Sequence, residues 1–254
     1  MTKPLNKMKI DSEYKNFLSK VREPEHKERE IHEFLEKNPS LLPYVSNCYS
    51  GIVVSEYQLS GTFDREPDFL YCFETSNGMV IYMVEIEAPH KKMFLKNSNN
   101  FTADFKQAYN QLEQWYAWTK NEGNSKVLLH TIRNLCNTPA NPDKIDKIEF
   151  ILIYGSRQEL NFGSRRDMRD TKNVGPFEVM SFDRLEHTTG DMIVVTPQKD
   201  HFKVIEITSD YEVNEALHGH FNSYNMIEVI EKNKDINDKD KKLMIKKVEE
   251  DWCD

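Results

Sequence analysis

The run of residues from Met79 to Glu87, MVIYMVEIE, constrains the fold of this chain more than any other stretch. A strand over these residues projects alternate side chains to opposite faces. One face would carry Val80, Tyr82, Val84 and Ile86, and the other would carry Met83, Glu85 and Glu87. A strand that is apolar on both faces is typical of the centre of a sheet covered on both sides. The two carboxylates at its end need an explanation, because a buried unpaired carboxylate is costly to desolvate.

Strands and helices are predicted to alternate along the chain, which favours the α/β class. The turn TSNG at 75–78 predicts that the strands on either side of it form an antiparallel hairpin. Residues 122–146 are predicted to be irregular around one short helix, and the tail from Glu231 to be a charged helix or partly disordered. Strands are predicted at 52–59, 68–73, 79–87, 147–155, 177–182, 192–197 and 202–207, and helices at 11–22, 25–38, 102–121 and 163–173.

The 254 residues suffice for one large domain with extensions. We expect an N-terminal helical extension over 1–24, a core over 25–190, and a strand pair with a charged helical tail over 191–254. No run approaches the roughly 18 apolar residues of a membrane helix, and the N-terminus lacks the pattern of a secretory signal. The four cysteines are scattered without a CxxC pair. These features predict a cytoplasmic protein without membrane contact.

The net charge of −8 and the pI of about 5.6 argue against a protein that coats nucleic acid passively. They leave open an enzyme that holds nucleic acid through metal ions and a local basic patch. Arg165, Arg166, Arg169 and Lys172 are interleaved with acids, so a solvated helix face is the default interpretation of that segment. A phosphate-contacting patch is the alternative.

Three acidic residues are predicted to meet at one edge of the sheet. Asp68 begins the first strand of the hairpin, and Glu85 and Glu87 end the second, so all three lie at the end opposite the turn. Clustered carboxylates suit Mg²⁺ or Mn²⁺, which also hold water and phosphate oxygens. The alternative is ordinary solvated carboxylates at strand ends.

The order of several motifs resembles a known family. EPDFLY followed by MVEIEAP is similar to the signature of the PD-(D/E)XK nuclease superfamily. The wider context over roughly residues 25–190 resembles the nuclease-like domain of the Shedu anti-phage defence family. The resemblance implies a restriction-endonuclease-like core with a mixed central sheet flanked by helices. The stretches that carry the Shedu resemblance are EREIHEFLEKNPSLL, VEIEAPHKKMF, FTADFKQAYNQLEQW, FILIYGSRQEL and VMSFDRL.

The resemblance also implies roles for individual residues. Asp68 and Glu85 match the two metal-ligating acids, and Glu28 matches a glutamate on the first core helix that often completes the metal shell. Gln111, with Trp115 four residues later, matches a Q-x-x-x-[YW] helix motif beside the site. The alternatives are that Glu28 is a solvated glutamate and that Gln111 fills a packing gap.

The sequence departs from the superfamily pattern at Glu87, where many members carry lysine. A carboxylate cannot stabilise a phosphate as an ammonium does, but it could add a metal ligand or act as general base. Lys91, Lys92 or Lys106 could supply the missing positive charge.

The function implied is a Mg²⁺- or Mn²⁺-dependent endonuclease acting on DNA, with RNA not excluded, in bacterial defence against phage. We also expect a homo-oligomer and a regulatory partner protein. One alternative is a nuclease-fold module with little or no turnover that binds nucleic acid or a partner. Another is an assembly module that uses the tail around Leu243, Met244, Val248 and Trp252.

Overall fold

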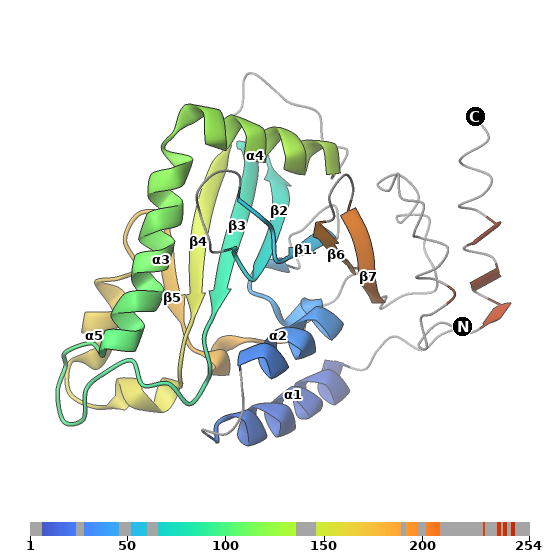
Figure 1. Cartoon of the computed structure of the whole chain (residues 1–254). Coiled ribbons are helices and arrows are strands. Elements are labelled where there is room, and N and C mark those ends of the chain that lie inside the picture. The colour runs from blue at the N-terminus through green and yellow to red at the C-terminus, as the bar shows by residue number, and fades with distance from the viewer. Residues whose placement is uncertain are drawn as a thin grey trace.

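A seven-stranded mixed sheet, in the order β5-β4-β3-β2-β1-β6-β7, forms the centre of the computed structural model (Figure 1). The structure describes residues 7–23, 28–45, 52–59, 66–135, 146–188, 192–197 and 202–208, and single or paired positions between 231 and 246. The strands are β1 (Ile52–Ser55), β2 (Phe69–Thr75), β3 (Gly78–Ile86), β4 (Lys147–Ile153), β5 (Phe177–Met180), β6 (Met192–Pro197) and β7 (Phe202–Thr208).

The hairpin and the central strand are confirmed. β2 and β3 pair antiparallel around the predicted turn, with Thr75 opposite Gly78. Every residue of β3 is buried, as expected for a strand covered on both faces. β4 runs parallel to β3, with Ile86 opposite Ile153, so these two strands end at the same edge of the sheet.

Helices cover both faces of the sheet (Figure 1). α3 (Ala103–Thr119) and α4 (Glu122–Leu135) pack on the face that carries Met79, Ile81 and Met83. α1 (Lys7–Val21) and α2 (Glu28–Lys37) pack on the face that carries Val80, Val84 and Ile86. The remaining helical elements are α5 (Arg165–Asp170) and the 3₁₀ turns η1 (Pro39–Leu41), η3 (Arg157–Asn161) and η4 (Phe182–Arg184).

The prediction of one short helix within irregular structure over 122–146 was wrong about length, because α4 is a helix of 14 residues. The side chain of Asn121 accepts hydrogen bonds from the backbone N–H groups of Gly123 at 3.0 Å and Asn124 at 3.3 Å, which start the helix. Leu128 and Ile132, one turn apart, are buried against the sheet. A glycine and two asparagines at the start hide this helix, because tertiary packing rather than propensity stabilises it.

Both ends of the described chain add to the central core. β6 pairs parallel with β1 and antiparallel with β7, so the predicted C-terminal strand pair continues the same sheet. In α1, the hydroxyl of Tyr14 donates a hydrogen bond to the carbonyl of Phe182 at 2.8 Å. Most of the predicted helical tail after Glu231 lies outside the described residues.

Within the described part of the chain, no helix has the length and apolar character needed to cross a bilayer.

Candidate active site

Asp68 lies immediately before β2, at the edge where β3 and β4 end. Its Oδ2 accepts a hydrogen bond from the backbone N–H of Ile86 at 2.7 Å, and its side chain is 21% exposed. Burial raises the pKa of Asp68 well above the usual range, although the bond from Ile86 acts in the opposite direction. The negative charges of Glu28, Glu87 and Glu56 raise that pKa further.

The two glutamates of the VEIE motif occupy different positions. Glu85 is the last but one residue of β3 and is 8% exposed; by alternation along the strand it lies on the side of Met83, against which α3 packs. Glu87 follows the strand, and its backbone N–H donates to the carbonyl of Ile153 at 3.0 Å. The strand pairing therefore holds Glu87 at the exit of the sheet.

Glu28 opens α2 and reaches the same edge from the other face. Its carboxyl group lies close enough to that of Glu87 for a hydrogen bond between them to contribute to its raised pKa. Burial and then the charge of Glu87 raise the pKa of Glu28 to about 7, while Lys91 acts in the opposite direction. A hydrogen bond between two carboxyl groups requires a shared proton, which is why a raised pKa accompanies it.

Lys91 places a positive charge beside Glu87, the position at which many superfamily members carry lysine. Its Nζ donates a hydrogen bond to Glu87 Oε2 and lies 3.9 Å from Glu28 Oε2. Burial alone would lower the pKa of Lys91, but the two carboxylates outweigh it and raise that pKa. The other two lysines named from the sequence, Lys92 and Lys106, are both exposed, and Lys106 lies on α3.

Gln111 and Trp115 lie on the buried side of α3, with exposed fractions of 5% and 0%. They face the same side of the sheet as Glu85. The structure thus couples Glu28, Asp68 and Glu87 electrostatically. Glu85 lies near the end of β3, and Gln111 lies on the buried side of α3.

His32 was missed by the sequence reasoning. It lies one helical turn after Glu28, and its Nε2 is 3.3 Å from the carbonyl oxygen and 4.0 Å from Oδ1 of Asp68. Its ring stacks on Phe69 at 4.7 Å, and its Nδ1 is 3.6 Å from a carboxylate oxygen of Glu36. The spacing of four residues from Glu28 was the available signal, since it places both side chains on one side of α2.

The described residues contain no group of three or more His, Cys, Asp or Glu side chains arranged closely enough to hold a metal ion. Lys91 instead bridges two of the carboxylates, those of Glu28 and Glu87. Their chemistry nevertheless fits a hard divalent cation, because all three offer oxygen and two have raised pKa values.

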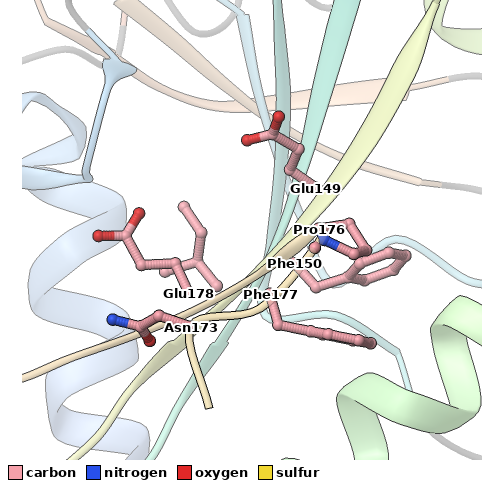
Figure 2. Close-up of a pocket in the computed structure, with 8 residues that line it drawn as sticks. Glu149, Phe150, Asn173, Pro176, Phe177 and Glu178 are labelled. Carbon is pink, nitrogen blue, oxygen red and sulfur yellow. The ribbon is translucent and has the colours of Figure 1, made fainter. Parts of the chain in front are cut away.

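A pocket of about 210 Å³ lies elsewhere, along β4 and β5 (Figure 2). Figure 2 shows the carboxylates of Glu149 and Glu178 on one side of these strands and the rings of Phe150 and Phe177 on the other. Glu178 accepts hydrogen bonds from the hydroxyl of Tyr44 at 2.8 Å and from Arg184 at 3.2 Å. The lining contains none of the residues predicted for the active site.

Comparison with known proteins gives one family. The family model described as Shedu protein SduA, C-terminal, matches residues 25–185. No curated protein and no solved structure matches the chain. Because the family model spans more than half of the sequence, the chain belongs to the Shedu SduA C-terminal family, and this membership points to a role in defence against phage.

Proposed function

We propose that the chain is a metal-dependent nuclease with a PD-(D/E)XK-like core that hydrolyses DNA phosphodiester bonds in anti-phage defence. The observation that carries the proposal is the electrostatic coupling of carboxylates from three segments: Glu28 of α2, Asp68 before β2 and Glu87 after β3. Titratable groups with strongly raised pKa values cluster at functional sites. A divalent cation would offset the burial and the mutual repulsion that raise the pKa values of Glu28 and Asp68.

In this proposal Asp68, Glu85 and Glu28 would hold Mg²⁺ or Mn²⁺. Asp68 Oδ2 is engaged by the N–H of Ile86, so Oδ1 is the oxygen that it would present to a ligand. When bound, such an ion lowers the pKa of a coordinated water and offsets charge on the reacting phosphate.

The remaining side chains act around the scissile phosphate. Glu87 would take the proton of the attacking water or add an oxygen ligand. Lys91, at hydrogen-bonding distance from Glu87, would neutralise charge on the phosphate. Gln111 would orient a ligand or a phosphate oxygen from the α3 side of the sheet.

The test is cleavage of linear and circular DNA by the purified chain with Mg²⁺, with Mn²⁺ or with EDTA. Glu85→Gln is the inactivating variant. Glu113→Gln, an exposed carboxylate on the same helix as Gln111, is the matched control. We expect metal-dependent cleavage by the wild type and by Glu113→Gln, and loss of cleavage in Glu85→Gln. Equal cleavage by all three proteins would show that the activity does not come from this site.

The second candidate is a nuclease-fold module that binds DNA or a partner protein without turnover. Glu87 in place of lysine favours it, as does the absence of a ligating cluster among the described residues. It predicts DNA binding that is indifferent to Glu85→Gln, with no cleavage by any variant in either metal.

A further inference from the structure

The connection between β3 and α3, residues 87–102, extends beside residues 157–170 beyond the carboxyl ends of β3 and β4 (Figure 1). Arg165, which is 8% exposed, joins the two segments. Its Nε donates to the carbonyl of Ser98 at 2.9 Å and its Nη2 to the carbonyl of Leu95 at 2.7 Å. A planar guanidinium that binds two carbonyls fixes the shape of the loop as well as its place.

Further contacts reinforce this arrangement. Glu159 Oε2 accepts hydrogen bonds from the backbone N–H groups of Met93 at 3.1 Å and Phe94 at 3.4 Å. The side chain of Asn99 donates to Ser164 Oγ at 2.9 Å. We call residues 92–99 together with 162–166 the clasped tip.

The guanidinium of Arg165 also lies over two rings, at 5.1 Å from the centre of Phe94 and 4.6 Å from that of Phe162. Arg165 is thus committed to internal contacts and does not belong to a free basic face. The interpretation of the 163–173 segment as a simple solvated face is wrong for this residue.

The outer surface of the clasped tip is basic and apolar. Leu95 and Phe162 are each 48% exposed, although both are large apolar side chains. Lys92, Lys96 and Arg166 are exposed beside them. Residues 91–100 contain three lysines and no acid, in a chain whose net charge is −8.

Acids near the tip are partly neutralised. Asp170 is paired with Arg169, and Asp167 is exposed on α5. The Nζ of Lys172 lies 4.1 Å from the centre of the Tyr109 ring, so this lysine is engaged in an internal contact and does not belong to the outer surface of the tip. The excess of positive charge comes from Lys92, Lys96 and Arg166.

We propose that the clasped tip is a docking surface for double-stranded DNA. Lys92, Lys96 and Arg166 would contact backbone phosphates, and Leu95 and Phe162 would pack against sugars or an exposed base. The inference deepens the proposed function and rests on it, because the tip follows directly after Glu87 and Lys91 in the chain. A duplex seated on the tip would reach the carboxylate edge of the sheet.

The internal contacts have a role in this docking. A loop that is already fixed by Arg165 and Glu159 loses less conformational entropy on binding than a free loop does. A basic surface with exposed apolar side chains on a rigid support is suited to an extended polyanion. A partner protein with an acidic surface would not require the tip to lie beside the carboxylates.

The test measures binding in EDTA, where no metal-dependent cleavage interferes, to a short fluorescent DNA duplex by anisotropy over a series of salt concentrations. The tip variant is Lys92→Ala with Lys96→Ala. The matched control is Lys126→Ala with Lys147→Ala, which removes two exposed lysines, one on α4 and one at the opposite end of β4. Binding that uses phosphates weakens with salt, and the slope of this dependence falls by about one for each phosphate that the protein no longer neutralises.

We expect the tip variant to bind more weakly than wild type and its salt slope to fall by about two, while the control keeps both values. Phe162→Ser should weaken binding without changing the slope, since it removes no charge. Equal losses in the tip variant and the control, or no binding by wild type, would overturn the proposal. If the tip variant bound an RNA duplex more weakly but kept wild-type binding to DNA, the assignment to DNA would be overturned.

Cleavage assays on the same proteins separate this inference from the proposed function. Binding that depends on the tip without cleavage by any protein would leave the docking surface and refute hydrolysis. Metal-dependent cleavage that is unchanged in the tip variant, with unchanged binding, would leave hydrolysis and refute the docking surface.

Discussion

At its amino end β3 meets one carboxylate with a matched arginine, whereas at its carboxyl end it meets three carboxylates, of which two, Glu28 and Glu87, lie beside Lys91. Asp146 Oδ1, at the amino end, accepts hydrogen bonds from Arg133 Nη2 at 2.6 Å and from the backbone N–H of Met79 at 2.9 Å. Both side chains of this ion pair are largely buried, at 9% and 18% exposed. The one negative charge of Asp146 is balanced by the one positive charge of Arg133. The backbone N–H of Met79, near the start of β3, also has its hydrogen-bond acceptor in Asp146.

The carboxyl end is arranged differently. Glu28, Asp68 and Glu87 are brought together, and burial with mutual repulsion raises the pKa values of Glu28 and Asp68. A balanced buried pair contributes to holding the fold, but an excess of buried carboxylates costs stability unless a proton or a cation compensates it. This excess of buried carboxylates at the carboxyl end is why we propose that end as the active site.

The largest expected effect concerns activity at the carboxyl end. We expect Asp68→Asn to lower the cleavage rate by roughly 10²–10³-fold or more, because the amide cannot ligate a cation as a carboxylate does. The same variant keeps the acceptor for the N–H of Ile86 and removes a charge that is unfavourable when buried, so its melting temperature in EDTA should not fall. Retained cleavage, or a lower melting temperature, would remove the contrast between the two ends.

The amino end should respond in the opposite way. Arg133→Met leaves Asp146 buried without its partner and should lower the free energy of unfolding by about 3 kcal/mol, measured by urea denaturation. Arg133→Met combined with Asp146→Asn should recover part of this loss, since no uncompensated charge remains. Cleavage per folded molecule should be unchanged; a fall in it would show that both ends serve activity.

Lys91 tests how the carboxyl end compensates its own charge. We expect Lys91→Met to lower the cleavage rate by roughly 10-fold to 100-fold and to reduce stability in EDTA, because the ammonium no longer offsets Glu87 and Glu28. Lys91→Arg keeps the charge and should restore stability more fully than activity. If Lys91→Met cleaved at the wild-type rate, Lys91 would have only a structural role.

The smallest effect is a pH dependence of stability without metal. Glu28 has a pKa raised from 4.5 to about 7, so the stability that its protonated form contributes is present below about pH 4.5 and is lost as the pH rises through about 7. The Glu28→Gln side chain does not titrate, so the stability of this variant relative to wild type should increase as the pH rises over this range. At pH 8 its melting temperature should be higher than that of wild type by about 2 °C. The effect is small because the Glu28 side chain is 46% exposed. Saturating Mg²⁺ should reduce the difference, and a difference that grows towards low pH would have the wrong sign.

Much of the candidate site follows from local sequence patterns. The apolar run at 79–87 and the turn at 75–78 predicted the central strand and the hairpin, because side-chain alternation and turn chemistry act over a few residues. Those two elements are enough to bring Asp68 beside the end of β3. The resemblance to the Shedu family was confirmed over 25–185.

Other features depend on contacts between distant segments. The side chain of Glu28 could have been solvated on an acidic helix, and only the packing of α2 on the sheet brings it to Glu87. His32 reaches Asp68 for the same reason. The length of α4 was underestimated because its start has low helix propensity and its stability comes from burial of one face.

The order of residues therefore determines where the strands lie, which face of each is apolar, and that carboxylates follow β3. Tertiary structure alone decides that Lys91 compensates for Glu87 and that Arg165 closes a loop instead of facing solvent. The physical reason is range: strand alternation and turns are set by neighbouring residues. The energy of a buried charge depends on every group packed around it, from any part of the chain.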